Sequence, residues 1–349
     1  MKDINSGSIR TFEDMTFGAS DIVITTHMKP DGDAIGSSVA MYRFLKDNGK
    51  SPKIVINDSY PPYLSFLITP EMSDDLIIRT EDPQEADGLI LGSDLIICLD
   101  FNAFHRTDGL EASLKEANGR KILIDHHLNP SREAFDLSFS ETEVSSASEL
   151  LYHILINTSA AGGDAARLGR KCAEAIMTGM TTDTNNFANS VYPSTLHMAS
   201  DLLAAGVDRE MILNCIYNQY GENRLRLLGH IMKDLLKTTP DGVAYIVLDK
   251  ETLNRYNVAE GDTEGFVNMP LSIARIRMSI LIKEDGDRVR VSIRSKRGTS
   301  ANMCARRFFN GGGHENAAGG RLYIPDDIKG IEEAGDYIER NTHIFLNNE

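Results

Sequence analysis

The sequence predicts an α/β domain built on a parallel sheet, followed by a smaller α+β domain. The first observation is that short apolar segments, typical of buried strands, alternate with helical patterns up to residue 125. The second is that the pattern becomes mostly helical after residue 125 and returns to strands from residue 242. The 349 residues suit two domains, at roughly 100–200 residues each. We expect the first domain over 1–215, a helical linker over 216–240 and the second domain over 241–349.

The first domain is expected to contain a parallel sheet with helices on both faces. Its strands are short runs of apolar and β-branched residues, as buried parallel strands require. They are expected at residues 21–26, 53–56, 95–99 and 121–124. Helical spacing of apolar residues predicts helices at residues 34–48, 83–86, 110–117, 146–157, 164–182 and 193–205.

The second domain is expected to mix strands and helices. An amphipathic helix over 223–237 leads into it. Strands are expected at residues 243–248, 279–283 and 288–294, and a helix at 299–309. Three glycines follow at 311–313, and the small residues at 317–319 suggest the start of another helix.

The charge is acidic overall but unevenly distributed. The formal net charge is −15, from 36 Lys and Arg against 51 Asp and Glu, which disfavours binding to long duplexes or to an anionic membrane surface. Residues 275–321, however, hold 11 basic and four acidic residues, a net charge of +7, and the remainder carries −22. The basic segment is either a solvated face or a complement to a phosphate substrate.

Cysteine usage and hydropathy suggest a cytoplasmic protein with no membrane partner. The four cysteines are widely spaced and form no CxxC pair, so a thiolate zinc site is not supported. No apolar run approaches the roughly 18 residues that a membrane span needs.

Three candidate metal ligands lie in the loop after the first predicted strand. His27, Asp31 and Asp33 belong to the segment HMKPDGDAIGS. Carboxylates this close together repel one another, and a divalent cation relieves that repulsion. Asp-Gly-Asp alone is also a common turn, but the preceding strand, the His and the Gly-Ser at the helix start favour a metal site.

Further candidate ligands follow later elements, and carboxyl ends of parallel strands meet at one edge of a sheet. Asp100 and the Asp125-His126-His127 motif end two predicted strands, and Asp183 ends a helical run. Asp100 or Asp183 alone could equally cap a helix. Together the set predicts two divalent cations about 3.5–4 Å apart, bridged by one carboxylate. The expected ligands are His27, Asp31, Asp33, Asp100, His126 and Asp183.

The order of these motifs resembles the DHH phosphoesterase family, which is named for the motif at residues 125–127. The resemblance covers nearly the whole chain, because GGGHENAAGG at residues 311–320 is similar to the glycine-rich signature of the DHH-associated second domain. In length and pairing the chain is most similar to the nanoRNase and pAp-phosphatase subfamily, often described as exopolyphosphatase-related. Here pAp is 3′-phosphoadenosine 5′-phosphate.

The resemblance implies a role for each candidate. One cation would be held by His27, Asp31 and Asp100, and the other by Asp33, Asp100, His126 and Asp183, so that Asp100 is the bridge. His127 would contact the phosphate or assist proton transfer, and Asp125 would orient a histidine. The family is mostly Mn²⁺-dependent, and its active site lies in the cleft between the two domains.

The resemblance also implies substrate contacts. Arg106 matches a basic position after Asp100, although a surface arginine is the alternative. In the second domain, arginine and glycine N–H groups could bind phosphate; the candidates are Arg294, Ser295, Gly312, Gly313, His314 and Asn316. One departure is that Asn185-Asn186 follow Asp183-Thr184, where the family often has glycine. The resemblance therefore does not predict the shape of the substrate wall at this position.

We therefore expect a metal-dependent phosphoesterase in which a hydroxide held between two metals attacks phosphorus. The expected substrates are short oligonucleotides, including dinucleotides, and pAp. The alternatives are an inorganic pyrophosphatase or polyphosphatase, a cyclic-dinucleotide phosphodiesterase, a single-strand DNA exonuclease or a non-catalytic nucleotide sensor. A sensor predicts a damaged ligand set, whereas all six residues are present. The oligomeric state stays open, and a homodimer is compatible with the resemblance.

Overall fold

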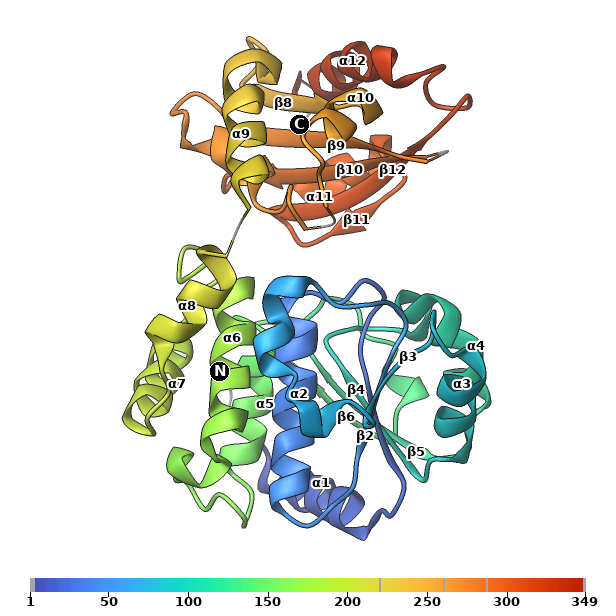
Figure 1. The fold of residues 1–349 in the computed structure, drawn as a ribbon, viewed down its shortest axis with the longest axis vertical. Coiled ribbons are helices and arrows are strands. Elements are labelled where there is room, and N and C mark those ends of the chain that lie inside the picture. The colour runs from blue at the N-terminus through green and yellow to red at the C-terminus, as the bar shows by residue number, and fades with distance from the viewer. Residues whose placement is uncertain (1–3, 220, 260, 287, 348–349) are drawn as a thin grey trace. The chain divides into compact units, whose positions relative to one another are not determined.

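A computed structural model describes residues 4–219, 221–259, 261–286 and 288–347. The chain divides into two compact units, Met1–Gln219 and Tyr220–Glu349, and each is built around its own six-stranded sheet (Figure 1). No helix in these described ranges is both long and apolar enough to cross a membrane.

The sheet of the first unit is parallel throughout, in the order β3-β2-β1-β4-β5-β6. The four predicted strands are confirmed, and two short edge strands, β3 and β6, are added. β3 is apolar but has only three residues, and β6 has four residues of which two are serines, so each gives little signal. The strands are β1 (Ile22–Thr25), β2 (Lys53–Ile56), β3 (Leu76–Ile78), β4 (Leu95–Leu99), β5 (Arg120–Asp125) and β6 (Leu137–Ser140).

Helices cover both faces of this sheet, as the continuous apolar strands predict. Alternate residues of β1 face opposite layers: Ile22 and Ile24 pack with one apolar cluster and Val23 with the other. Figure 1 shows α3 and α4 on one side of the sheet and α1, α2, α5 and α6 on the other. The helices are α1 (Ser6–Gly18), α2 (Gly32–Asp47), α3 (Pro83–Gly92), α4 (Glu111–Glu116), α5 (Ala147–Ile156), α6 (Arg170–Asp183), α7 (Pro193–Ala204) and α8 (Arg209–Tyr217).

The strand order reverses direction at the centre of this sheet. From β1 the chain adds β2 and β3 on one side, then returns to add β4, β5 and β6 on the other. Connections leave β1 and β4 in opposite directions, and doubly wound sheets generally form a crevice at the carboxyl ends of strands related in this way. Ligands of doubly wound sheets bind at such a switch point.

The second sheet is mixed, in the order β11-β12-β10-β9-β8-β7, with β8 and β9 parallel and the other pairs antiparallel. The three predicted strands are confirmed as β8, β9 and β10. The helix start expected at 317–319 is wrong, because these residues begin β12, which pairs with β10 along its whole length. The strands are β7 (Lys237–Thr238), β8 (Val243–Leu248), β9 (Met278–Asp285), β10 (Arg288–Ser295), β11 (Gly312–Gly313) and β12 (Ala317–Tyr323).

Helices also pack on both faces of the second sheet. One apolar cluster includes α11 and α12 residues, and another includes Leu227 and Ile231 against the opposite face. The segment expected as a linker therefore falls in both units. Its start belongs to α8, at the end of the first unit. Its remainder begins the second unit with α9, which continues as one π-helical turn over Ile231–Leu235. The helices are α9 (Glu222–His230), α10 (Lys250–Arg255), α11 (Ala301–Phe308) and α12 (Ala334–Asn347).

Candidate metal centre

The loop between β1 and α2 brings three of the expected ligands to the carboxyl edge of the first sheet. Asp31 is the N-cap of α2, and its Oδ1 accepts hydrogen bonds from the N–H groups of Asp33 and Ala34 at 3.0 and 3.2 Å. Asp33 lies in the first helical turn and is buried, whereas the Asp31 side chain is 59% exposed. Gly32 has to be glycine because a Cβ there would lie 2.3 Å from Oγ1 of Thr182.

Asp100 follows β4 directly and is held in a left-handed conformation, with φ of 61°. Its N–H donates to the Ile124 carbonyl of β5 at 3.0 Å, which continues the sheet pairing past the end of the strand. A non-glycine residue with positive φ carries strain that the surrounding structure must offset, and such strain concentrates at functional sites. The turn leaves the Asp100 side chain buried, with 4% of it exposed.

The two oxygens of Asp100 face two different groups of candidate ligands. Oδ2 lies 3.5 Å from Nε2 of His27, which is also 3.9 Å from Asp31. Oδ1 lies 3.4 Å from Nε2 of His126. Two compact groups of ligand atoms result, His27 with Asp31 and Asp100, and Asp33 with Asp100 and His126. Sharing Asp100 is what a bridging carboxylate requires.

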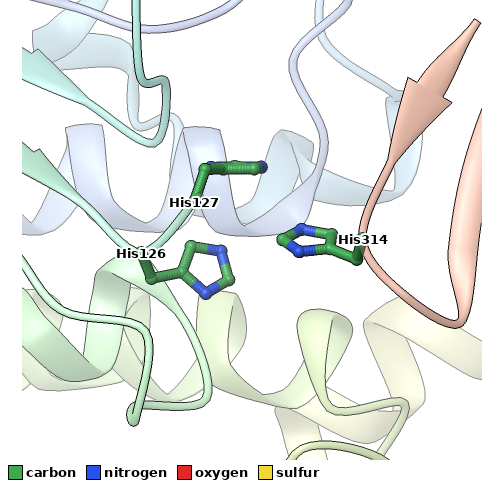
Figure 2. Close-up of side chains that lie close together, drawn as sticks. All are labelled: His126, His127 and His314. Carbon is green, nitrogen blue, oxygen red and sulfur yellow. The ribbon is translucent and has the colours of Figure 1, made fainter. Parts of the chain in front are cut away.

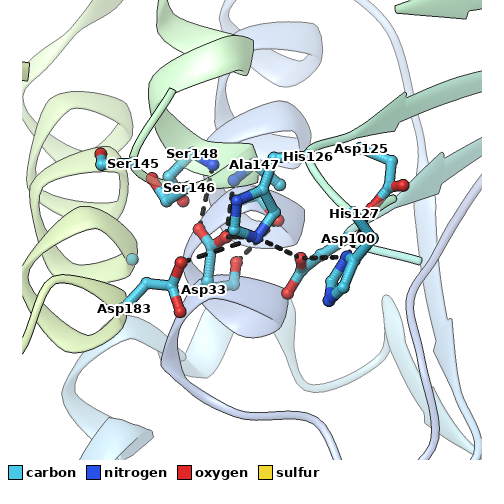
Figure 3. A network of polar contacts seen from close by, with 12 residues as sticks. Asp33, Asp100, Asp125, His126, His127, Ser145, Ser146, Ala147, Ser148 and Asp183 are labelled. Carbon is cyan, nitrogen blue, oxygen red and sulfur yellow. Dashed lines mark hydrogen bonds and ion pairs between the residues drawn. The ribbon is translucent and has the colours of Figure 1, made fainter. Parts of the chain in front are cut away.

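His126 lies close to the remaining carboxylates of the set (Figure 3). Its Nε2 lies 3.9 Å from Asp33 Oδ2 and 3.5 Å from Asp183 Oδ2. Asp183 is the last residue of α6 and its side chain is 30% exposed. All six residues expected as metal ligands therefore converge on one edge of the sheet.

The start of α5 binds the Asp33 carboxylate, a contact that was not predicted from the sequence. The N–H groups of Ala147 and Ser148 donate to Asp33 Oδ2 and Oδ1 at 2.6 and 2.9 Å. Helix N-termini bind carboxylates well because their first N–H groups lack partners inside the helix. The pattern Ser146-Ala-Ser-Glu149, a capping-box sequence, was the available signal for this helix start.

The electrostatics of the centre favour a bound cation. Burial and the neighbouring carboxylates of Asp100 and Asp183 raise the pKa of Asp33 well above its usual value. Burial alone would also raise the pKa of Asp100, but His126 and His27 hold that pKa well below its ordinary value. Burial lowers the pKa of both histidines, yet the adjacent carboxylates raise that of His27 to about 9 and that of His126 to about 10.

The residues present fit a divalent cation. Asp100 Oδ1 is buried and accepts no hydrogen bond with ordinary geometry, so it keeps a lone pair available. Imidazole and carboxylate donors together suit Mn²⁺, Zn²⁺ or Fe²⁺. Such ions relieve the mutual repulsion of these carboxylates.

His127 is held differently from His126. Its Nδ1 lies 2.7 Å from Asp125 Oδ1, and Asp125 is completely buried at the end of β5. This hydrogen bond fixes the ring orientation and assigns the proton to Nδ1, so that Nε2 can act on a substrate. The two imidazole rings meet edge to face with centroids 4.8 Å apart (Figure 2).

One of the candidate substrate-binding residues belongs to the first unit and the others belong to the second. In the first, the Arg106 carbonyl accepts the Met28 N–H at 2.8 Å, and the Arg106 charge acts to lower the pKa of His27, which puts Arg106 beside the centre. In the second, Arg294 and Ser295 end β10, and Gly312 and Gly313 form β11. His314 lies in the turn between β11 and β12 (Figure 2).

Asn316 and Ser295 are engaged in one local network of the second unit. The Asn316 amide donates to Ser295 Oγ and to the carbonyls of Lys296 and Thr299 at 3.0–3.2 Å. The Ser295 hydroxyl in turn donates to the Thr299 carbonyl at 2.6 Å. These contacts hold the loop that follows β10.

The Asn185-Asn186 departure has a physical explanation. Asn185 donates its N–H to the Thr182 carbonyl and Asn186 to the Thr181 carbonyl, which together form a Schellman motif at the end of α6. This motif needs a left-handed residue at Asn185, whose φ is 46°. Glycine is the usual choice there and asparagine is the next most tolerant residue.

Comparisons with known proteins identify a domain family in each unit. The DHH family N-terminal domain matches residues 21–180, and the DHHA1 domain matches residues 229–339. A Bacillus subtilis protein named bifunctional oligoribonuclease and PAP phosphatase NrnA is 28% identical over 89% of this chain and 92% of that protein. The Thermus thermophilus protein of the same name is 31% identical over 86% of this chain and 84% of that protein.

A solved structure also matches along the whole chain. An exopolyphosphatase-related protein from Bacteroides fragilis is 37% identical, with a TM-score of 0.91, and the match covers 99% of this chain and 98% of that one. A manganese-bound exonuclease RecJ shares the fold at 14% identity, with a TM-score of 0.52.

Proposed function

This chain belongs to the DHH phosphoesterase family, and on that premise we propose that it hydrolyses short oligonucleotides and pAp with two Mn²⁺ ions. The observation that carries the proposal is Asp100, whose two oxygens face separate ligand groups. The relatives named as oligoribonuclease and PAP phosphatase, similar over most of both chains, support the choice of substrates.

The residues of the proposed active site have different roles. His27, Asp31 and Asp100 hold one ion, and Asp33, Asp100, His126 and Asp183 hold the other. Bound divalent cations supply a nucleophilic oxygen at neutral pH and neutralise charge that develops on phosphate oxygens. His127, oriented by Asp125 through Nδ1, contacts the phosphate and, in its imidazolium form, passes the Nε2 proton to the leaving oxygen. Arg106 is the phosphate-binding side chain of the first unit, and Arg294 and the glycines before His314 are the phosphate-binding groups of the second.

The test is hydrolysis by the full chain in Mn²⁺, with Asp100→Asn as the inactive variant. Asp94→Asn is the matched control, because Asp94 lies at the opposite end of β4 and accepts the N–H groups of Ser20 and Asp21. We expect the unmodified protein and Asp94→Asn to cleave an RNA dinucleotide and pAp, and Asp100→Asn to lose at least a thousandfold of that activity.

The same assay separates the alternatives. Faster cleavage of pyrophosphate, of a cyclic dinucleotide or of single-stranded DNA would replace the proposed substrates with that one. Nucleotide binding without turnover by the unmodified protein would make it a sensor. Equal activity in Asp100→Asn and Asp94→Asn would show that the proposed centre is not the active site.

A further inference from the structure

The segment that follows Asp183 is held in an unfavourable backbone conformation. Asn185, Asn186 and Phe187 have φ values of 46°, 57° and 66°, so three consecutive non-glycine residues are left-handed. The Schellman motif explains the first of them only. A left-handed conformation is costly for an L-residue with a side chain, and most of all for a bulky one such as Phe187.

One side chain contacts both residues that the motif leaves unexplained. Arg209, the first residue of α8, donates from Nη2 to Asn186 Oδ1. The same guanidinium lies over the Phe187 ring, with Cζ 5.5 Å from the ring centroid. A planar guanidinium can make a hydrogen bond and a cation–π contact at once, which an ammonium group cannot do as well.

The other end of α8 contacts α6 itself. The Tyr217 hydroxyl lies 3.4 Å from the Thr181 carbonyl, and this carbonyl also accepts the Asn186 N–H at 2.8 Å. The first residue of α8 therefore contacts the segment directly after α6, and its last residue contacts the last turn of α6. That turn ends at Asp183, one of the residues assigned above to the metal centre.

We propose that Arg209 is a positioning residue for the metal centre, which it serves by locking the left-handed turn after Asp183. The inference deepens the proposed function and rests on it. If Asn186 relaxed, its bond to Thr181 would break and α6 would no longer have to end at Asp183. The Asp183 carboxylate is more exposed than those of Asp33 and Asp100, so burial constrains it less.

The measurement is Mn²⁺ binding to metal-free, full-length protein by titration calorimetry. In Arg209→Ala we expect one Mn²⁺ dissociation constant to rise about tenfold or more, the range found when a residue supporting a ligand is removed. The Mn²⁺ concentration for half-maximal hydrolysis should rise in parallel, while kcat at saturating Mn²⁺ stays within about threefold. A purely structural role would lower the melting temperature and leave the dissociation constants unchanged.

Arg170→Ala is the matched control. Arg170 is an exposed arginine at the opposite end of α6, and its Nε donates to Glu174 at 2.7 Å. Its removal should leave Mn²⁺ binding unchanged. Arg209→Lys keeps the charge but not the planar group, so its Mn²⁺ affinity should fall between those of the unmodified protein and Arg209→Ala. If Arg209→Ala does not fold, Arg209→Lys provides the measurement.

A rescue variant tests the cause. Glycine adopts left-handed conformations without a steric cost, so adding Asn186→Gly to Arg209→Ala should restore most of the Mn²⁺ affinity. Unchanged Mn²⁺ binding in Arg209→Ala and Arg209→Lys, or no recovery with Asn186→Gly, overturns the proposal. Failure of the unmodified protein to bind Mn²⁺ or cleave any substrate would instead overturn the proposed function.

Discussion

Asp125, His126 and His127 are neighbours in sequence, yet each has a different environment. Asp125 completes β5 and is buried, His126 faces three carboxylates, and His127 turns back to Asp125. The two imidazole rings are neighbours, with centroids 4.8 Å apart, but their nitrogens have different partners: His127 Nδ1 bonds to Asp125, whereas His126 Nε2 faces the carboxylates of Asp33, Asp100 and Asp183. This difference in partners supports the proposal that one histidine of the motif binds metal and the other acts on substrate.

The assignment of His127 can be tested by separating binding from turnover. In His127→Gln we expect kcat to fall by about 10²–10⁴-fold, the usual contribution of a positioned acid or base. Mn²⁺ binding measured by calorimetry should stay within about threefold, because His127 is not assigned to either ion. A loss of Mn²⁺ affinity as large as the loss of kcat would make His127 a ligand, grouped with Asp100 and Asp125.

Glu149 is a buried residue that the sequence did not single out. Its carboxylate accepts hydrogen bonds from the Ser145 N–H and from the hydroxyls of Ser145, Ser194 and Thr195, at 2.5–3.0 Å. His153 Nε2 lies 3.5 Å away. These contacts join the start of α5, which holds Asp33, to the start of α7. Burial alone would raise the pKa of Glu149, but these partners lower it from 4.5 to about 2.

The low pKa of Glu149 predicts how stability depends on pH. The ionised group stabilises the fold above about pH 4.5, and this contribution is lost as pH falls towards 2. Glu149→Gln should therefore cost about 2–3 kcal/mol of unfolding free energy at pH 7 and progressively less below pH 4.5. Urea unfolding at several pH values measures this difference. A cost that stays constant between pH 7 and pH 3 would exclude the ionised carboxylate as its source.

At the level of elements, α2 and α6 contain two of the expected ligands, Asp33 and Asp183, and pack very closely. A Cβ at Gly36 of α2 would lie 2.8 Å from the Ala175 carbonyl and the Gly179 N–H of α6. The close approach places Asp33, near the start of α2, beside Asp183, at the end of α6. Gly179 also leaves room for the Asp33 carboxylate, since a Cβ there would lie 2.8 Å from Asp33 Oδ1.

Gly36→Ala should accordingly destabilise the first unit. Overpacking of this kind costs about 1–3 kcal/mol, because backbone atoms of α6 would have to move. Gly88→Ala in α3 is the control: nothing lies within 4 Å of its Cβ position, so it should gain about 0.4–1 kcal/mol. Denaturant unfolding of the two variants gives the comparison. Equal stability of Gly36→Ala and the unmodified protein would mean that the helices can separate freely.

The elements best predicted were those with a strong local pattern. The central strands β1, β4 and β5 contain the apolar runs IVI, LIICL and ILI, and the candidate ligands follow these runs closely, so both could be found from the sequence. The edge strands β3 and β6 and the glycine strand β11 have short or ambiguous sequences and form through pairing with neighbours. The small residues of β12 carry no helical information, and the seven-residue pairing with β10 decides their conformation.

At the level of the whole molecule, the acidic excess belongs to one unit. Residues 1–219 hold 17 basic and 32 acidic residues, a net charge of −15, whereas residues 220–349 hold 19 of each. The carboxylates of the metal centre lie within the acidic unit, where the remaining negative charge favours cations. The sequence showed a basic segment at 275–321, but only the division into units shows that the second unit is neutral as a whole.

This division predicts separate responses to metal. Each unit has its own apolar core, so calorimetry of the full chain should resolve two unfolding transitions. Mn²⁺ at a hundredfold excess over its dissociation constant should stabilise the first unit by about 2.7 kcal/mol per site, since it relieves repulsion among Asp33, Asp100 and Asp183. That corresponds to a rise of roughly 5–11 °C per site in one transition for a unit of this size, and chelation with EDTA should reverse it. Asp100→Asn should lose the shift, whereas an equal shift of both transitions would mean that metal binding is not confined to the first unit.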